Sequence, residues 1–269
     1  MPANPAAARA FHDLHRQGLL ILANAWDAGS ARLIESLGAR AIATTSCGVA
    51  WSHGYPDGDF LPMDRVVWTV ASIARVVKVP VTADVEGGYS DDPQAVGANI
   101  ARVIDAGAAG INIEDGSASV DLTCAKIAAA RAAADRAGVD LFVNARCDVY
   151  LRGLAPGREV EETLARAARY REAGASGLFA PGIVEPDQIR AVASGCGLPL
   201  NIMARKGLPD GAGLEALGAR RLSSGGDLAE AVMGRLKTLA SAYLASGDCE
   251  PLLEGAMTYP DLNALMVTD

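Results

Sequence analysis

The chain has 269 residues, of which 50% are hydrophobic and 21% are charged, and its formal net charge is 24 − 32 = −8 at pH 7. This size allows a large core in one domain, and the acidic balance without any run of Lys and Arg excludes nucleic acid as an expected partner. Five scattered cysteines indicate a reduced protein, and the lack of a long apolar run or a secretory signal predicts a cytoplasmic protein without a membrane segment.

The predicted elements alternate along the chain between short apolar strands and helices. Strands are expected at 19–24, 41–46, 79–86, 110–115, 141–148, 177–180, 198–203 and 220–223. Helices are expected at 5–18, 28–37, 63–77, 92–106, 122–137 and 158–173, from 186, up to 217, at 228–245, and at 260–266 in the tail. Asp92-Pro93 is typical of a helix start, whereas residues 47–62 indicate an unusually long loop.

Eight strand–helix units predict an α/β fold with a parallel sheet. The strands are apolar rather than alternating, as expected for a sheet covered on both faces. Eight units in roughly 250 residues match a closed (β/α)8 TIM barrel. An open doubly wound sheet is the alternative, but no Gly-x-Gly-x-x-Gly motif follows the first strand. We expect one barrel domain over residues 1–269, with an N-terminal helix and a C-terminal helical tail at 247–269.

Two carboxylates close the third predicted strand. Side chains alternate between the faces of a strand, so Asp84 and Glu86 are expected to project to the same side. Two acids side by side repel each other unless a cation or a proton lies between them. On these residues alone, a solvated strand end and a metal or acid/base site are equally good interpretations.

Other strands end in the same way, and in a TIM barrel the active site lies at the carboxyl ends of the strands. Three acids from neighbouring strands are expected to converge there, and their hard oxygen donors suit Mg²⁺, or Mn²⁺ in its place. No His/Cys set suits zinc, and His12 and His15 are expected on the surface. The polar residues at these strand ends are Asn24, Asp27, Ser46, Asp84, Glu86, Glu114, Asp115, Asn144, Arg146, Asp148, Asn201 and Ser223.

Three further segments can bind an anion. Arg146 shares a strand face with Asp148, either as a structural ion pair or, as we favour, as a fork for a carboxylate or phosphate. A small-residue turn can present backbone N–H groups to an anion, and it is formed by Ser46, Cys47 and Gly48. The loop with Gly225 and Gly226 either binds phosphate, which would favour an enzyme for a phosphorylated substrate, or only caps the following helix.

Several motifs occur together in one order along the chain: Asn24-Ala25-Trp26-Asp27, Thr45-Ser46-x-Gly48, Pro56-Asp57, Ala83-Asp84-x-Glu86, Asn112-Ile113-Glu114-Asp115 and Asn144-Ala145-Arg146-x-Asp148. With this set the chain resembles the isocitrate lyase/phosphoenolpyruvate mutase superfamily over nearly its whole length. The resemblance implies a TIM barrel that forms a homo-oligomer, a dimer or tetramer, with the eighth helix exchanged between subunits.

The resemblance also implies a site. A Mg²⁺ ion is expected near Asp84, Glu86 and Glu114, with Asp57 close by, and a small α-oxo acid is expected to chelate it. Arg146 and Asp57 are the implied catalytic residues. The substrate is expected to be held by Ser46, Cys47, Gly48 and Arg146, and a second carboxylate by Asn201.

The chain departs from its relatives after the fourth strand. Residues 116–124 contain neither the Lys-x-Cys-Gly-His loop of the carbon–carbon lyases nor the gating-loop Asn of the mutase. What remains is machinery that stabilises an enolate when a bond at C3 of an α-oxo acid breaks. We therefore predict a Mg²⁺-dependent lyase or decarboxylase for small α-oxo (di)carboxylates such as oxaloacetate. The alternatives are P–C chemistry like that of phosphoenolpyruvate mutase or phosphonopyruvate hydrolase, and a non-catalytic binder of oxaloacetate or 2-oxoglutarate.

Overall fold

The structure, a computed structural model, describes residues 4–267, and one sheet of nine parallel strands forms its centre. The sheet order is β1-β9-β8-β7-β6-β5-β4-β3-β2. The strands are β1 (Leu20–Leu22), β2 (Asn24–Ala25), β3 (Ile42–Thr44), β4 (Val81–Asp84), β5 (Gly110–Glu114), β6 (Phe142–Arg146), β7 (Gly177–Phe179), β8 (Leu200–Met203) and β9 (Arg221–Ser223).

One interrupted strand closes the barrel. β1 and β2 follow each other with only Ala23 between them, and β1 pairs with β9 while β2 pairs with β3. They therefore act as one strand that joins both edges of the sheet. The predicted (β/α)8 barrel is confirmed, and the open doubly wound sheet is excluded.

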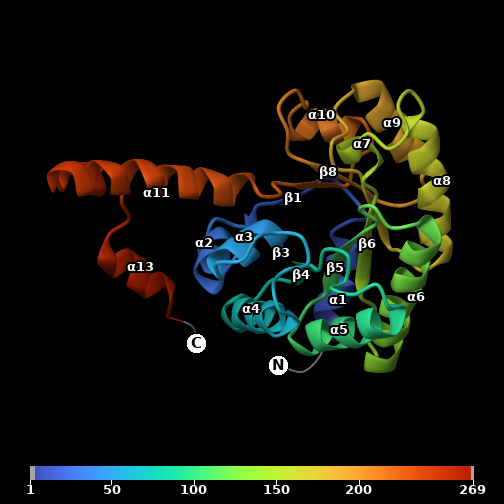
Figure 1. The fold of residues 1–269 in the computed structure, drawn as a ribbon, viewed down its shortest axis with the longest axis horizontal. Coiled ribbons are helices and arrows are strands. Elements are labelled where there is room, and N and C mark those ends of the chain that lie inside the picture. Colours follow the sequence, from blue (N-terminus) through green and yellow to red (C-terminus); the bar gives the residue numbers. More distant parts are fainter. Residues whose placement is uncertain (1–3, 268–269) are drawn as a thin grey trace.

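Helices surround the strands, as Figure 1 shows, except at the C-terminal end, where α11 extends away from the barrel and α13 lies outside the ring of helices. The helices are α1 (Pro5–Asp13), α2 (Ala28–Ser36), α3 (Ser46–Ser52), α4 (Met63–Val76), α5 (Pro93–Asp105), α6 (Val120–Ala137), α7 (Val149–Arg152), α8 (Glu159–Glu172), α9 (Pro186–Gly195), α10 (Gly211–Ala216), α11 (Asp227–Ser246), α12 (Glu250–Leu253) and α13 (Tyr259–Leu265).

Helix starts follow the local sequence. The Asp92 side chain accepts a hydrogen bond from the backbone N–H of Gln94 at the start of α5, and Pro93 needs no partner there because it has no N–H. Asp27 and Ser30 form a reciprocal capping box at the start of α2. These caps fix where each helix leaves the strand before it, and so they fix the loops at the carboxyl end of the barrel.

The core is continuous between the strands and the helices around them. Ile111 and Ile113 of β5 are fully buried and face the helices, whereas Asn112 between them faces the barrel interior. Leu178 and Ile202 are likewise fully buried in β7 and β8. Burying one such side chain stabilises the fold by about 1.5–3 kcal/mol, so the sheet carries much of the stability.

Helix α1 closes the amino end of the barrel, where one expectation from the sequence is wrong. The helix was predicted to end at Gly18, but it ends at Asp13. His15, which was expected on the surface, is buried, with an exposed fraction of 3%. Its ring stacks on Phe142 with 4.0 Å between centroids and meets Phe11 edge-on. Gly110 is needed here because a Cβ atom would lie 2.8 Å from the Phe11 ring.

The carboxyl end of the barrel differs from the prediction in its connections. The segment predicted as a loop over residues 47–62 begins inside helix α3, and β3 ends at Thr44 instead of Ser46. The short helices α7 and α12 were not predicted. Short helices bury few residues and carry a weak periodic signal, so sequence patterns miss them easily.

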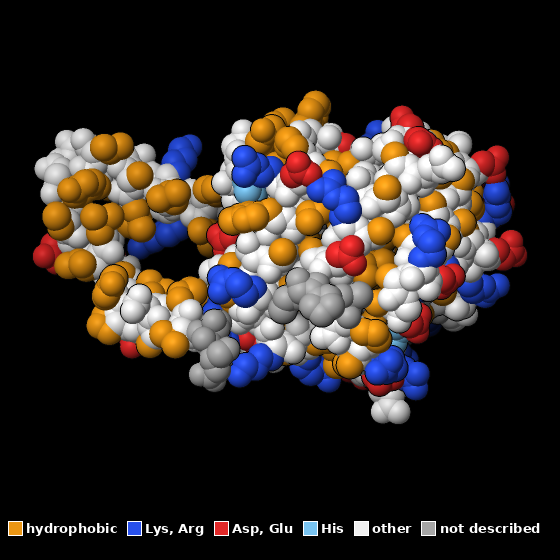
Figure 2. Space-filling model, turned by 90° about the horizontal axis from the view of Figure 1, so that it is seen from below, with side chains coloured by type: hydrophobic (Ala, Val, Ile, Leu, Met, Phe, Trp, Pro, Cys, Tyr) orange, Lys and Arg blue, Asp and Glu red, His pale blue; other side chains and the backbone are white. Residues whose placement is uncertain are grey.

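The C-terminal part of the chain lies largely outside the barrel. Of the twenty residues in α11, only Ala229 is buried. Helix α13 returns to the barrel and contacts α2, where the Arg32 Nε donates a hydrogen bond to the Leu265 carbonyl over 3.0 Å. Figure 2 shows apolar side chains gathered over this projecting arm. The predicted tail extends to 269, but residues 1–3 and 268–269 lie outside the described part of the chain.

No helix within residues 4–267 combines the length and the apolar character that crossing a membrane requires.

Candidate active site

A cavity of about 150 Å³ opens at the carboxyl ends of the strands. Larger hollows of about 650 and 590 Å³ lie at the opposite end of the barrel, but neither brings an arginine together with several carboxylates from strand ends. The cavity is lined by Asn24, Thr45, Ser46, Cys47, Asp57, Asp84, Asn112, Arg146, Phe179, Met203, Ser223, Gly225 and Gly226. Predicted site residues from six strand ends or loops therefore meet in one place.

Asp84 lies at the end of β4 and faces this cavity. Its Oδ1 accepts a hydrogen bond from the backbone N–H of Glu86 over 3.1 Å, and its Oδ2 accepts one from the Asn112 side-chain amide over 3.2 Å. Burial raises the pKa of the Asp84 carboxyl, and the nearby Arg146 guanidinium opposes that rise. A carboxylate desolvated in this way gains stability from any cation that enters the cavity.

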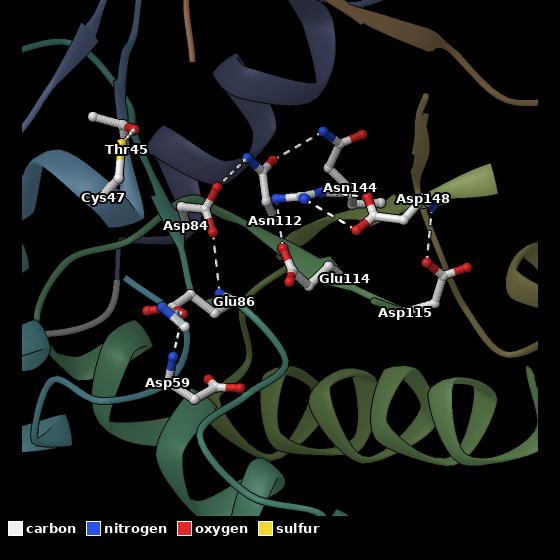
Figure 3. Close-up of polar contacts among 12 residues, drawn as sticks. Thr45, Cys47, Asp59, Asp84, Glu86, Asn112, Glu114, Asp115, Asn144 and Asp148 are labelled. Carbon is white, nitrogen blue, oxygen red and sulfur yellow. Dashed lines mark hydrogen bonds and ion pairs between the residues drawn. The ribbon is translucent and has the colours of Figure 1, made fainter. Parts of the chain in front are cut away.

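Glu86 does not project beside Asp84 as the strand rule predicted, because β4 ends at Asp84. Glu86 has a φ of +49°, so the chain turns and the alternation of faces stops. Its Oε2 accepts hydrogen bonds from the backbone N–H groups of Gly58 and Asp59, and its Oε1 accepts one from the Tyr89 hydroxyl over 2.7 Å. Glu86 therefore holds the loop that carries Asp57, as Figure 3 shows for its contact with Asp59.

Three non-glycine residues with positive φ lie in these two loops, namely Asp59, Glu86 and Tyr89. Such conformations are sparsely populated and persist where surrounding contacts fix them. The hydrogen bonds to Glu86, together with the bond from the Tyr89 N–H to Asp59 over 3.1 Å, supply those contacts. The position of Asp57 at the cavity thus depends on a loop that Glu86 anchors.

Arg146 at the end of β6 is held on two sides by carboxylates. Its Nε and Nη2 donate to the two oxygens of Asp148 over 2.6 and 3.0 Å, and its Nη1 lies 2.5 Å from Glu114. The structural ion pair considered from the sequence is present, and the same side chain also lines the cavity. Burial outweighs this guanidinium and raises the pKa of Glu114 to about 8.

Behind Arg146 lies a buried network that connects three elements. The backbone N–H of Asp148 donates to the Asp115 Oδ1 over 2.8 Å. The other oxygen of Asp115 accepts from Arg166 over 2.8 Å and from the Tyr170 hydroxyl over 2.7 Å, both from α8. Figure 3 shows Asp115 and Asp148 to the right of Glu114, with a dashed line for the hydrogen bond between them. The sequence placed Asp115 at the site but gave no signal for its partners on α8, which are more than fifty residues away.

A second group of buried, hydrogen-bonded polar side chains lies below the cavity. The Asn112 Oδ1 accepts hydrogen bonds from Asn144 over 2.9 Å and from the Arg221 Nη2 over 3.2 Å. Arg221 has an exposed fraction of 1%, and burial lowers its pKa to about 10. The sequence did not single out Arg221, because an arginine at the start of a strand usually faces solvent.

Two predicted substrate residues do not line the cavity. Asn201 is buried, and its amide donates to the Ser223 hydroxyl over 3.3 Å. Gly48 lies in α3, where an added Cβ would come within 2.8 Å of Thr45 and 2.9 Å of Trp26, so this glycine permits close packing. The loop suggested as a phosphate site is not separate, because Gly225 and Gly226 line the same cavity as Asp84.

The donors for a cation are present, although they are not gathered into a finished site. Within residues 4–267, no three His, Cys, Asp or Glu side chains are arranged as metal ligands. Asp57 and Asp84 share the cavity, and Glu114 lines the adjoining hollow of about 490 Å³. Their oxygen donors and the raised pKa of Asp84 and Glu114 fit a hard divalent cation. The ligand set of Asp84, Glu86 and Glu114 stays a prediction.

The fold and this cavity define a class: (β/α)8 barrels with a polar site at the carboxyl ends of the strands, where barrel enzymes carry their catalytic residues. The family model for phosphoenolpyruvate phosphomutase matches residues 11–244. The chain belongs to this family, within the phosphoenolpyruvate mutase/isocitrate lyase superfamily.

Individual relatives agree with this assignment. An uncharacterized protein of Mycobacterium tuberculosis is 37% identical over 258 residues, which is 96% of each chain. The oxaloacetate decarboxylase of Pseudomonas entomophila is 28% identical over 217 residues, covering 76% of this chain and 72% of that protein. The structure of a phosphonomutase-like protein of Burkholderia cenocepacia J2315 is 43% identical, with a TM-score of 0.83 over 87% of this chain and 99% of that chain.

Proposed function

We propose that the protein is a Mg²⁺-dependent lyase that cleaves a C–C bond in small α-oxo (di)carboxylates of the oxaloacetate type. The observation that carries the proposal is the cavity in which Asp57, Asp84 and Arg146 meet at the carboxyl ends of the strands. The oxaloacetate decarboxylases among the relatives share the family and most of the chain length, which supports this reaction type.

Each group at the cavity has a role in the proposal. A Mg²⁺ ion held by Asp84 and Glu114, with Asp57 and Glu86 beside them, would supply positive charge where an oxyanion develops. The first turn of α3, with Ser46 and Cys47 at the cavity, would orient the substrate carboxylate with backbone N–H groups. Arg146, fixed by Asp148, would stabilise the enolate oxygen after the bond at C3 breaks.

The decisive test is a panel of α-oxo acids incubated with Mg²⁺ and followed for both binding and product. We expect turnover by the wild-type protein and, for Asp84→Asn, a loss of at least about 10²-fold in kcat, because charge at the oxyanion is no longer compensated. Mn²⁺ titration by calorimetry gives a second readout, and its affinity should also fall. Asp187→Asn on α9 is the matched control, because Asp187 is exposed and does not line the cavity. Unchanged Mn²⁺ affinity and turnover in Asp84→Asn would refute the proposal.

P–C bond chemistry is the second candidate, and the 43% identity to the phosphonomutase-like protein favours it. The same panel separates the two when it includes phosphonopyruvate, because release of inorganic phosphate or rearrangement of the P–C bond would then exceed cleavage of oxaloacetate. Oxalate is a useful probe, since the structure of phosphonopyruvate hydrolase, which shares this fold, is a complex with oxalate and Mg²⁺. Binding of oxaloacetate or 2-oxoglutarate without any product would identify a non-catalytic binder.

We also propose that the protein is a homo-oligomer, a dimer or tetramer, in which α11 packs against another copy of the chain. Helix α11 exposes Val232, Leu236 and Leu244, and a single copy of the chain leaves these side chains in water. Ile21 of β1 has an exposed fraction of 60%, so the outer face of this strand also lacks a covering helix. An exchanged α11 would cover both surfaces.

A further inference from the structure

Arg221 crosses the barrel interior below the cavity. It begins β9, and its Nη2 donates a hydrogen bond over 3.2 Å to the Oδ1 of Asn112 on β5. β9 and β5 are separated in the sheet by β8, β7 and β6, so the side chain has to span the interior. On the side of the amino end, the guanidinium carbon lies 5.9 Å from the centre of the Phe11 ring. The guanidinium is therefore held between α1 and Asn112.

The burial of this arginine costs the fold free energy. Its side chain is fully buried, and its Nε and Nη1 have no hydrogen-bond partner among residues 4–267. Within the described chain its charge is matched by no ion pair, and Asp84 acts on it only through space. An unpaired buried cation is destabilising, so an apolar side chain of similar length would suit the fold as well or better. The contribution of Arg221 therefore lies elsewhere than in stability.

The hydrogen bond of Arg221 goes to an amide that also contacts Asp84. The Asn112 Oδ1 accepts from Arg221 and Asn144, whereas the Asn112 Nδ2 donates to the Asp84 Oδ2 over 3.2 Å. Figure 3 shows Asp84, Asn112 and Asn144 joined in a row by dashed lines. A primary amide has a donor end and an acceptor end, so its orientation decides whether Asp84 meets an N–H group or an oxygen.

Arg221 and Asn144 differ in what they impose on Asn112. An arginine can only donate, so the Asn112 atom that it contacts has to be the oxygen. The Asn144 Oδ1 has no partner in the described part of the chain, so no hydrogen bond there keeps the Asn144 amide from turning over. If both amides turned, their mutual hydrogen bond would persist, but Asn112 would present its oxygen to the Asp84 carboxylate. Arg221 disfavours this arrangement, because its own N–H group would then face another N–H group.

We propose that Arg221 is a positioning residue that acts through Asn112, keeping an N–H donor on Asp84 and so fixing the carboxylate that would hold the cation. The inference rests on the proposed function, in which Asp84 is a metal ligand. Arg221 does not line the cavity, so it acts only by setting the amide. Asp84 is then held on both oxygens, by the Asn112 amide and by the Glu86 N–H. A ligand fixed before the ion arrives loses less conformational freedom on binding.

Replacing Arg221 should lower cation affinity without lowering stability. For Arg221→Met, which removes the charge and keeps an unbranched side chain, we expect the affinity for Mn²⁺, measured by calorimetry, to fall about tenfold. The midpoint of denaturant unfolding without metal should equal that of wild type or rise, because an unpaired buried cation is lost. Arg221→Lys keeps a group that can only donate and should hold the Mn²⁺ affinity within about threefold of wild type.

A buried substitution away from the cavity is the matched control. Leu178→Ala removes apolar contacts in β7 and should lower the unfolding midpoint. Its Mn²⁺ affinity should not change, since Leu178 does not line the cavity. An equal loss of affinity in Leu178→Ala and Arg221→Met would indicate a general loosening of the barrel and would overturn the inference.

A double-mutant cycle tests whether Arg221 acts through Asn112. Asn112→Ala alone should lower the Mn²⁺ affinity by at least about tenfold. Adding Arg221→Met should then lower it by less than about twofold more, because the amide that Arg221 orients is already gone. Neutron diffraction from crystals of the deuterated wild-type protein gives a readout that depends on no variant. The amide deuterons of Asn112 should lie on the atom that faces Asp84.

Three further results would overturn the inference and leave the proposed function intact. One is an Arg221→Met variant with the Mn²⁺ affinity of wild type. Another is an undiminished loss, again about tenfold, from Arg221→Met in the Asn112→Ala background. The third is a pair of deuterons on the Asn112 atom that faces Arg221. If instead wild type binds no Mn²⁺ and turns over no α-oxo acid, the proposed function itself fails.

Discussion

Helix α5 and helix α11 show two different ways of placing apolar surface. Helix α5 has thirteen residues and buries five of them against the barrel, including Ile100, Val103 and Ile104. Helix α11 has twenty residues and buries only Ala229, although it carries leucines, valine and methionine along its length. One helix completes the core of its own chain, whereas the other leaves apolar side chains exposed, which the proposed second copy would cover.

Side chains buried inside the barrel stabilise a single copy of the chain. Side chains of α11 would contribute stability only in the proposed oligomer, where that contribution depends on protein concentration. Burial inside the barrel stabilises a single copy, and its contribution is the same at every concentration. In the proposed oligomer, burial of α11 against another copy would stabilise by mass action, so its contribution would grow with concentration. Substitutions in the two regions should therefore behave differently, and the following expectations run from the largest effect to the smallest.

The largest effect is expected for Leu178→Ala in β7. Leu178 is fully buried, and a cavity of this kind costs about 3 kcal/mol of unfolding free energy. Chemical denaturation at protein concentrations a hundredfold apart should give the same loss. Leu244→Ala on α11 is the comparison, because Leu244 has an exposed fraction of 84% and should cost a single chain little. A loss for Leu178→Ala that varies with concentration would contradict the distinction between the regions.

Leu236→Glu tests the proposed contact of α11 directly. A charge at a residue that packs against another copy should weaken assembly by at least about 30-fold in the dissociation constant, on the scale of an interface hot spot. Light scattering after size-exclusion chromatography measures the mass. Thr238→Glu adds the same charge roughly 200° around the helix axis and should leave assembly intact. A wild-type protein that is monomeric at all accessible concentrations would remove the basis for this expectation.

The stability of the amino end of the barrel should depend on pH. Burial lowers the pKa of His15 to about 3, with the Arg221 charge acting in the same direction. The unfolded chain binds this proton more tightly than the folded chain, so stability falls as pH drops from about 6.5 towards 3. At pH 5 the contribution of His15 is a loss of about 2 kcal/mol.

Replacing this histidine should weaken the dependence of the unfolding free energy on pH at acidic pH. His15→Phe keeps the stacking on Phe142 and removes the titrating group, so unfolding free energy should decline less between pH 7 and pH 5 than in wild type. The same change at His53, which is half-buried in the turn after α3, serves as the control. If the unfolding free energy of His15→Phe and of wild type declined equally between pH 7 and pH 5, a group other than His15 would control the acid dependence.

The smallest effect is expected from Tyr170→Phe in α8. It removes one hydrogen bond to Asp115, worth about 1 kcal/mol, and so loosens the network that fixes Asp148 and Arg146. We expect kcat to fall about fivefold with little change in KM. Tyr150→Phe is the matched control, because the buried Tyr150 hydroxyl has no hydrogen-bond partner among the described residues. If both variants lose activity equally, the network does not position Arg146.

Much of the fold follows from local patterns along the chain. Apolar strands alternating with helices predict the barrel, because each unit must bury one face against the next. The carboxylates at the ends of β4 and β5 could be assigned to one site, since the carboxyl ends of parallel strands lie together. The motifs around Asp84, Glu114 and Arg146 also placed the chain in its family, which the match over residues 11–244 confirms.

Other features depend on contacts between distant parts of the chain. Glu86 obeys the rule of alternating faces only while the strand continues, and β4 ends two residues earlier. Its hydrogen bonds to Gly58 and Asp59 connect loops about thirty residues apart. No periodicity in the sequence carries that information.

The sequence by itself determined the barrel, the acids at its carboxyl end and the arginine beside them, because these follow from local periodicity and strand direction. Only the tertiary structure decided which of these groups share a cavity, that Glu86 anchors a loop, and that Asn201 lies below the site. The reason is physical: a side chain at the end of a strand takes its direction from the turn that follows and from the partners it finds there. The outward path of α11 is likewise settled by packing rather than by helix-forming residues, which would fit a covering helix equally well.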